Sequence, residues 1–181
     1  MSDSGFLKEL QQNGMMAAST SREVEKGSLL KRGGEIANEF YMVESGCLRS
    51  FVVDKKGKEH ILQFAPEGWV ISDRASFLSG EASDLFIDSI ESSVIRVLRY
   101  DNMRNMEDMS REQLLNSLKR IFRHTLTLQN RILQLISMSA QERYTDFMKT
   151  YPDLHNRVPQ RMIASYLGIT PEGLSRIRKE K

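Results

Sequence analysis

The chain ends on RVPQRMIASYLGITPEGLSRIRKEK (residues 157–181), which has the pattern of two short helices separated by a glycine. Ala164 is the small residue needed where two helices cross closely, and Gly168 tolerates the sharp turn between them. Thr170 is a suitable N-cap and Pro171 a suitable first helical residue, so the second helix begins cleanly. The stretch therefore predicts a helix-turn-helix unit. Its expected buried residues are Ile163, Ala164, Leu167, Ile169, Leu174 and Ile177.

The second helix of this unit is expected to present a polar and basic face. Glu172 and Arg176 lie near its N-terminus, and Arg178 lies near the edge of the face. Such side chains can hydrogen-bond base edges in the major groove, so we expect double-stranded DNA as a partner. Gly173 costs a helix about 1 kcal/mol relative to alanine, and it either lets the backbone approach DNA closely or leaves the helix soft until it binds. The residues predicted to bind DNA are Arg161, Thr170, Pro171, Glu172, Gly173, Ser175, Arg176 and Lys179.

The net charge of the 181-residue chain is only +2, but it is unevenly distributed. Residues 1–114 hold 14 Lys and Arg against 19 Asp and Glu, whereas residues 115–181 hold 12 against 5. A basic C-terminal third on an acidic body indicates that one end of the protein meets a polyanion.

The composition, with 40% hydrophobic and 28% charged residues, is that of a soluble globular protein. No stretch approaches the roughly 20 apolar residues of a membrane helix, and residues 1–26 lack the apolar run of a signal peptide. The lone Cys47, expected to be buried and inert, excludes an internal disulfide, a cysteine zinc site and a cysteine-ligated iron–sulfur cluster within one chain. We therefore expect a cytoplasmic protein with no membrane partner and no metal.

Residues 26–99 have the texture of β-structure. Their apolar runs EFYMV, CLRSFVV, HILQFA and VIRVL are rich in β-branched and aromatic residues, and glycines recur between them. DKKGKE predicts a hairpin turn in which Gly57 supplies a positive φ. This spacing favours an antiparallel sandwich or barrel and shows no dinucleotide or P-loop fingerprint. The preceding residues 5–20 predict a short amphipathic helix, with apolar residues at Phe6, Leu7, Leu10, Met15 and Met16.

Near Met109 the hydrophobic period changes to that of a long helix. Its seam is a heptad pattern formed by Leu114, Leu118, Ile121, Thr125, Leu128, Ile132 and Leu135. A second apolar flank is formed by Leu115, Phe122, Leu126, Leu133 and Ile136. Packing of the seam on the chain's own β-domain is one interpretation. Because two flanks exceed the need of one contact face, we favour a parallel homodimer through the seam, with Thr125 as a polar contact for a bound molecule.

A further helix is expected after the seam. Ser139 with Glu142 forms a capping box, Tyr144, Phe147 and Met148 are expected to point inward, and Pro152 ends the helix at Tyr151. The fold class is therefore α+β. Its expected parts are an effector-sensing, jelly-roll-like β-roll domain with the short N-terminal helix (1–108), a dimerisation helix (109–137) and a helix-turn-helix DNA-binding domain whose wing is absent or truncated (138–181).

A glycine-punctuated β-roll, a long helix and a C-terminal helix-turn-helix together resemble the Crp/Fnr family of bacterial transcription regulators. The resemblance rests most on IASYLGITPEGLSRIRK and SAQERYTDFM. It implies a homodimer that reads a palindromic operator, with Glu172 and Arg176 at the family's base-reading positions and RNA polymerase as a further partner. Pro171 stands where many members carry an arginine, which argues against the family's usual half-site.

Family members that bind cyclic AMP carry a phosphate cassette of Gly-Glu-Leu and, further on, Arg-Ser-Ala. Here Ser72-Asp73-Arg74 and Ser83-Asp84-Leu85 stand at those places. The arginine that would pair with the phosphate is lost and a carboxylate, Asp84, lies beside its place, which should cost several kcal/mol. We therefore expect no cyclic AMP binding of the family kind, and a β-roll that senses either a small molecule that the sequence does not identify or no ligand. The expected effector-pocket residues are Ser72, Asp73, Arg74, Ser83, Asp84 and Thr125.

Two other functions are weighed against this one. A metal enzyme on a cupin-like barrel would need histidines close together, but His60, His124 and His155 are far apart in the sequence, so we expect no enzyme and no haem site. A ligand-binding or interaction module of the same fold that has lost DNA binding remains the alternative, because Pro171, Gly173 and the missing wing depart from the family.

Overall fold

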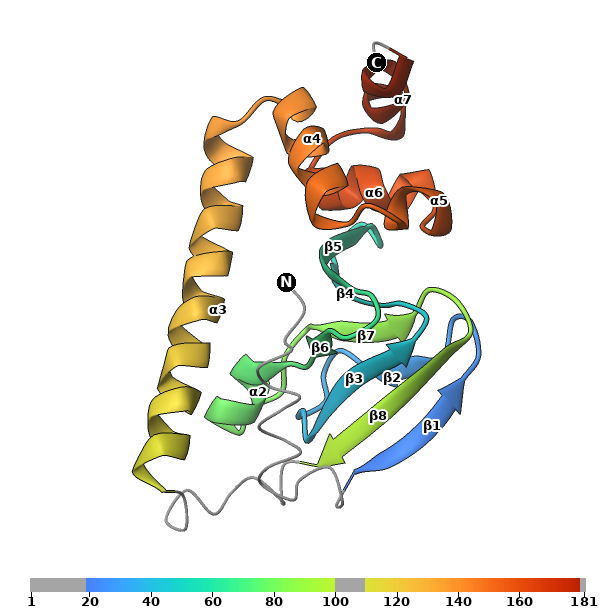
Figure 1. Ribbon diagram of the computed structural model, residues 1–181. Helices are drawn as coiled ribbons and strands as arrows, with labels where there is room; N and C mark the ends of the chain where they lie inside the picture. Colours follow the sequence, from blue (N-terminus) through green and yellow to red (C-terminus); the bar gives the residue numbers. More distant parts are fainter. Residues whose placement is uncertain (1–18, 100–109, 180–181) are drawn as a thin grey trace. The chain divides into compact units, whose positions relative to one another are not determined.

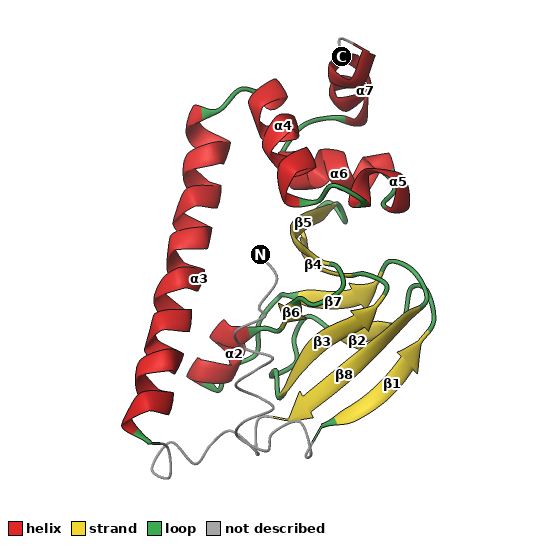
Figure 2. Ribbon diagram, viewed as in Figure 1, coloured by secondary structure: helices red, strands yellow, loops and turns green. Residues whose placement is uncertain are grey.

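The computed structural model describes residues 19–99 and 110–179, and the chain divides into two compact units, Met1–Met103 and Arg104–Lys181. Among the described residues, the first unit is built mainly of strands and the elements of the second unit are all helices (Figures 1 and 2). The short helix expected around Phe6 to Met16 lies outside the described residues, as does the expected start of the long helix at residue 109.

The described residues of the first unit contain two four-stranded sheets in which every neighbouring pair is antiparallel. One sheet has the order β1 (Thr20–Val24), β8 (Ser93–Arg99), β3 (Glu39–Ser45), β6 (Val70–Ile71). The other has the order β2 (Leu29–Lys31), β7 (Phe86–Ser89), β4 (Leu48–Val53), β5 (Glu59–Ala65). The core between them is formed by Tyr41, Val43, Leu48, Ala65, Ile71, Ile87, Ile95 and Val97.

The longer strands are the ones that the apolar runs predict. EFYMV begins β3, CLRSFVV contains β4, HILQFA lies in β5 and VIRVL lies in β8. The turn between β4 and β5 places Gly57 at φ +79°, and the Gly57 amide donates to the carbonyl of Asp54 at 2.9 Å. The antiparallel β-roll is therefore confirmed, together with this hairpin.

The strand region begins earlier than the sequence suggests. β1 starts at Thr20, before the expected boundary at Lys26, and four of its five residues are exposed. Such a strand carries no apolar alternation, and it exists because it pairs with β8 from Thr20↔Val97 to Val24↔Ser93. β2, β6 and β7 are also too short to be recognised from local pattern, as is α2 (Arg74–Ser79).

The second unit contains α3 (Arg111–Ser137), α4 (Ala140–Thr150), α5 (Leu154–Arg157), α6 (Gln160–Leu167) and α7 (Pro171–Lys179). Both hydrogen bonds of the predicted capping box are present: the Ser139 amide donates to Glu142 at 2.8 Å, and the Glu142 amide donates to the Ser139 hydroxyl at 3.3 Å. α4 ends at Thr150, immediately before Tyr151-Pro152, as the proline predicts. The single turn α5 was not expected from the sequence.

The core of the second unit joins α4, α5, α6 and α7. Tyr144 and Phe147 are buried as predicted, whereas Met148 is half-buried. The rings of Phe147, Tyr151 and Tyr166 pack together with centroids 5.3–5.9 Å apart. This cluster fixes α6 against α4. Within residues 19–99 and 110–179, no helix is long and apolar enough to cross a membrane.

Candidate nucleic-acid interface and effector site

The helix-turn-helix unit consists of α6, the turn at residues 168–170 and α7, and we refer to it as the reader. Ala164 is 1% exposed where the two helices meet, and Gly168 has φ +68° at the turn. The expected apolar contacts are also present, with Ile169 half-buried and the others buried. The buried residues are Ile163, Ala164, Leu167, Leu174 and Ile177.

The start of α7 is held by Thr170. Its hydroxyl accepts from the Gly173 amide at 3.1 Å, and its carbonyl accepts from the Leu174 amide at 3.0 Å. This is the N-cap that the sequence predicts. A Cβ on Gly173 would meet the Thr170 hydroxyl at 3.4 Å, an ordinary contact, so the fold of the single chain does not require glycine at position 173.

The residues predicted to contact DNA all lie on the reader. Arg161 is on α6, Thr170 is on the turn, and the remaining six belong to α7. All are exposed except Gly173, which is half-buried. Glu172 and Arg176 are one helical turn apart on the side of α7 opposite its buried Leu174. The N-terminal half of α7 therefore exposes a continuous polar face to solvent.

The seam of α3 is apolar and open to solvent in the single chain. Its apolar members are between 39% and 57% exposed, and the second flank is between 47% and 76% exposed. A helix of 27 residues that exposes this much apolar surface is expected to bind a partner surface. Thr125 is exposed, but its hydroxyl donates to the Ile121 carbonyl at 3.0 Å on the same helix. Its role in holding a bound molecule stays a prediction.

The stretch expected to form an effector cassette contains a buried carboxylate, Asp73. One of its oxygens accepts from the Ser76 amide at 3.1 Å and so caps α2. The other accepts from the Ser83 hydroxyl and lies 3.1 Å from the amino group of Lys31. Burial tends to raise the pKa of Asp73, but the hydrogen bonds from Ser83, Ser76 and Lys31 outweigh it and lower that pKa. Both carboxylate oxygens are therefore engaged within the protein.

Lys31 is the member of this site that sequence reasoning missed. It is 5% exposed and, besides its ion pair with Asp73, donates to the Leu85 carbonyl at 2.8 Å and to the Ser83 hydroxyl at 3.2 Å. It lies at the end of β2, far from the cassette in sequence, and no motif marks it. The β2–β7 pairing brings it beside residues 83–85.

The other expected effector-pocket residues differ in how far they are buried. Asp84 is exposed, and Arg74 is half-buried as the first residue of α2. The Ser72 hydroxyl is buried and has no hydrogen-bond partner among the described residues. Asp73 and Ser83 are thus in direct contact, whereas Thr125 belongs to the second unit.

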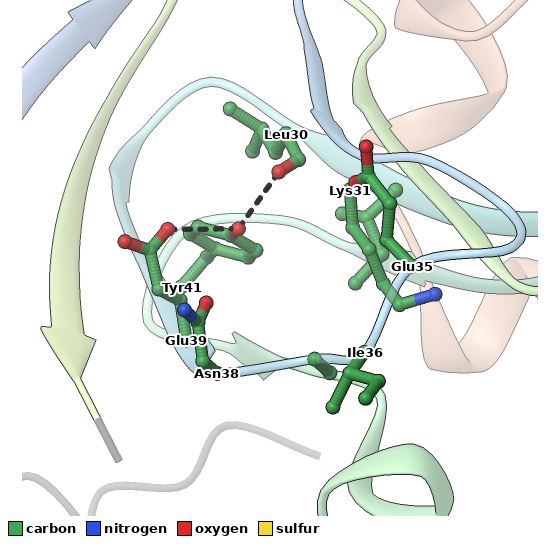
Figure 3. A pocket seen from close by; sticks show the side chains of 9 residues that line it. Leu30, Lys31, Glu35, Ile36, Asn38, Glu39 and Tyr41 are labelled. Carbon is green, nitrogen blue, oxygen red and sulfur yellow. Dashed lines mark hydrogen bonds between the residues drawn. The ribbon is translucent and has the colours of Figure 1, made fainter. Parts of the chain in front are cut away.

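A small polar cavity of about 110 Å³ lies beside Lys31 (Figure 3). Within it the Tyr41 hydroxyl lies 2.9 Å from the Leu30 carbonyl and 3.0 Å from the Glu39 carboxylate. Burial and the neighbouring Glu39 raise the pKa of Tyr41. The cavity is well below the roughly 300–1,000 Å³ typical of small-molecule sites. Its lining residues are Leu30, Lys31, Glu35, Ile36, Ala37, Asn38, Glu39, Tyr41 and Ile87.

The histidines and the cysteine have ordinary structural surroundings where the structure describes them. His60 pairs with Asp54 at 2.9 Å in the β4–β5 hairpin. Hydrogen bonds from His60 and from the amides of Lys58 and Lys56 lower the pKa of Asp54 to about 2. His155 contacts the Pro152 carbonyl at 2.8 Å, and Cys47 is completely buried.

Comparison with known proteins identifies the first unit. Residues 21–109 match the model of the cyclic nucleotide-binding domain. The fumarate and nitrate reduction regulatory protein of Vibrio cholerae is 24% identical over 173 residues, covering 86% of this chain and 66% of the relative. The anaerobic regulatory protein of Haemophilus influenzae is 23% identical, covering 86% and 64%. The chain therefore spans just under two thirds of the length of these relatives.

Solved structures show the same fold. FixK2 from Bradyrhizobium japonicum superposes with a TM-score of 0.77 at 20% identity, covering 90% of this chain and 83% of that one. A Crp/Fnr-family regulator from Thermus thermophilus superposes with a TM-score of 0.65 at 15% identity, covering 89% and 84%. The class is thus a cyclic nucleotide-binding β-roll followed by C-terminal helices. Residues 21–109 thus form a cyclic nucleotide-binding domain, and the chain as a whole is similar to transcriptional regulators of the Crp/Fnr family.

Proposed function

We propose that the protein is a dimeric DNA-binding transcription regulator that reads a palindromic operator through α7. The observation that carries this proposal is the polar face of α7, where Glu172 and Arg176 are exposed on a capped, well-packed helix. The apolar seam of α3 supplies the surface for a second copy, and two readers related by two-fold symmetry match the two halves of a palindrome. Such a regulator would act on RNA polymerase in the bacterial cytoplasm.

Replacing Arg176 with alanine is expected to weaken binding to the preferred duplex about 10- to 100-fold, because a base contact of this kind contributes about 1–3 kcal/mol. Glu172→Ala should relax the preference for one base position in the same way. Fluorescence anisotropy on palindromic duplexes selected with the full chain measures both effects.

Two control variants separate base reading from general charge attraction. Arg178→Ala removes the same charge from the edge of α7 and should change affinity about threefold or less. Lys179→Ala should weaken all sequences about equally and make the salt dependence shallower, as loss of a phosphate contact does. Base reading would be disproved by Glu172 and Arg176 variants that bind every duplex like the wild type. That result would favour an interaction module without DNA binding.

We further propose that cyclic AMP is not the effector. In the family pattern an arginine pairs with the cyclic phosphate, but Ser83 stands at that place and donates its hydroxyl to Asp73. The Asp73 carboxylate is already paired with Lys31, and the exposed Asp84 adds a repelling charge nearby. The site therefore offers a phosphate no free cationic partner among these residues.

Isothermal titration of the full chain with cyclic AMP is expected to show no saturable heat up to about 1 mM. The melting temperature should also be unchanged by the nucleotide, since a ligand present at its Kd or above stabilises the folded state it binds. Titration with 5′-AMP serves as the control for non-specific nucleotide binding. Saturable binding of cyclic AMP alone would contradict the proposal about the effector without affecting the proposal about DNA.

A further inference from the structure

The backbone carbonyls at the end of α6 accept hydrogen bonds from residues of the reader and from residues of other helices. The last four carbonyls of a helix lack partners in the helix itself, and in α6 they belong to Ala164, Ser165, Tyr166 and Leu167. Two are satisfied locally, because the Ile169 amide donates to Ala164 at 3.0 Å and the Gly168 amide donates to Ser165 at 3.1 Å. This is the Schellman arrangement, and it requires the positive φ of Gly168.

The other two carbonyls accept hydrogen bonds from arginines on different helices. Arg131 of α3 donates from Nη2 to the Tyr166 carbonyl, and its guanidinium stacks over the Tyr166 ring with Cζ 4.0 Å from the centroid. Arg143 of α4 donates from Nε to the Leu167 carbonyl at 2.9 Å. The same guanidinium donates from Nη1 to the Met138 carbonyl at 2.6 Å, in the link between α3 and α4.

Further contacts tie the same region to α3. The Gln134 side chain donates to Asp146 of α4 at 2.7 Å. A Cβ on Gly168 would meet the Leu135 side chain at 3.3 Å, so the turn of the reader lies against the last part of α3. Leu135 belongs to the seam, and Arg131 lies one helical turn before it. The turn of the reader and the seam are therefore joined by direct contacts.

We propose that Arg131 and Arg143 are positioning residues that fix the reader relative to α3. The proposal rests on the proposed function, because it concerns how two readers are held at the spacing of two half-sites. Cationic donors at a helix C-terminus interact favourably with the helix dipole as well as with the carbonyls. The planar guanidinium of Arg143 reaches two backbone segments at once, which a lysine ammonium at the same site would not reproduce with the same geometry. In a dimer, α3 of each copy then sets the distance between the two α7 helices.

The test uses the full chain and the palindromic duplex that the wild type selects from a random pool. One base pair inserted between the half-sites should weaken wild-type binding at least tenfold, because it moves and rotates one half-site relative to the other. In the double variant Arg131→Gln with Arg143→Gln this penalty should fall to threefold or less. Affinity for a duplex with a single half-site should stay within about twofold, since the reader itself is intact.

Arg123→Gln is the matched control. Arg123 is an exposed arginine of α3 that donates only to the Lys119 carbonyl of its own helix in the hydrogen bonds described, so its loss should leave the tenfold spacing penalty unchanged. If the double variant does not fold, Arg131→Lys keeps the charge without the stacked guanidinium and should lower the penalty about threefold. A full spacing penalty in either folded variant would overturn the proposal.

Amide hydrogen exchange separates this proposal from the proposed function. In the double variant the amides of residues 163–170 should exchange at least tenfold faster than in the wild type, while Arg123→Gln should leave them unchanged. If the wild type selects no duplex at all, the proposed DNA binding fails, and unchanged exchange in the double variant would then overturn the positioning role independently.

Discussion

Replacing Ile121 and Leu128 together with lysine is expected to convert the protein from a dimer to a monomer and to weaken operator binding about 100- to 10,000-fold. Both residues belong to the seam, are 54% and 52% exposed in the single chain, and lie seven positions apart. The dimer binds more tightly than the monomer by this factor because, once one reader has bound its half-site, binding of the second half-site is intramolecular. Sedimentation equilibrium measures the first effect and fluorescence anisotropy the second.

The physical reason is the cost of burying charge in an apolar contact. In a parallel dimer the same residue of each copy meets its counterpart, so each lysine would face a second lysine across the seam. The ammonium groups would lose hydration and repel one another without an acidic partner. The alternative interpretation, in which the seam covers the chain's own β-roll, predicts a monomer before the change and a less stable monomer after it.

Two double variants on other faces of α3 test whether the seam, and not another face of the helix, is the dimer contact. Thr127→Lys with Asn130→Lys adds the same charge away from the seam, at exposed positions, and should leave a dimer. Leu126→Lys with Leu133→Lys places it on the second apolar flank, where residues are 55% and 52% exposed. A dimer that survives the seam variant but dissociates with the flank variant would show that the flank is the contact surface.

The reader and the capping box could be predicted from sequence because their determinants are local. Thr170 caps the helix that begins at the next residue, and Gly168 forms the turn because its own φ is positive. Ser139 and Glu142 are three residues apart and hydrogen-bond each other in the capping box. Hydrogen bonds between residues three or four positions apart require particular residue types at a fixed spacing, so they can be recognised in a short stretch of sequence. The longer strands were predictable for a similar reason, since their apolar runs are continuous.

The missed parts depend on partners that are distant in the sequence. β1 is exposed and polar, and only its register with β8 makes it a strand. Lys31 is buried only because β2 pairs with β7 and brings it to Asp73 and Ser83. In the sequence, nothing distinguishes Arg131 from the other basic residues of the long helix, and only the structure shows that it donates to the Tyr166 carbonyl. Long-range pairings of this kind have no fixed spacing that a sequence pattern could reveal.

Lys31→Met is expected to lower the free energy of unfolding by about 3–5 kcal/mol at pH 7. Lys31 and Asp73 are 5% and 4% exposed, and removal of one partner of a buried ion pair leaves the other charge uncompensated. Methionine keeps most of the side-chain volume, so loss of packing contributes little. Urea unfolding followed by circular dichroism measures the change, and Lys55→Met, at an exposed lysine, should alter it by about 0.5 kcal/mol or less.

The double variant Lys31→Met with Asp73→Asn should recover most of this loss. Asparagine removes the unpaired charge and can still accept from the Ser76 amide, which is the bond that caps α2. Replacing both members of a buried ion pair by neutral groups is often close to neutral for stability. A double variant as unstable as the single one would show that the loss comes from packing around position 31 and not from the charge on Asp73.

The pH dependence gives an independent test of the same pair. The pKa of Asp73 is lowered in the wild type, so its contribution to stability is present above the unfolded-state value near 4 and is lost as the pH falls through the lower folded-state value. In Lys31→Met the folded-state pKa of Asp73 rises, because a favourable charge and a hydrogen bond are removed while burial remains. The difference in unfolding free energy between the two proteins should therefore be largest near neutral pH and shrink as the pH falls from the raised pKa of Asp73 in the variant to its lowered pKa in the wild type. A difference that stays constant from pH 7 to pH 3 would contradict a charged Asp73 as its cause.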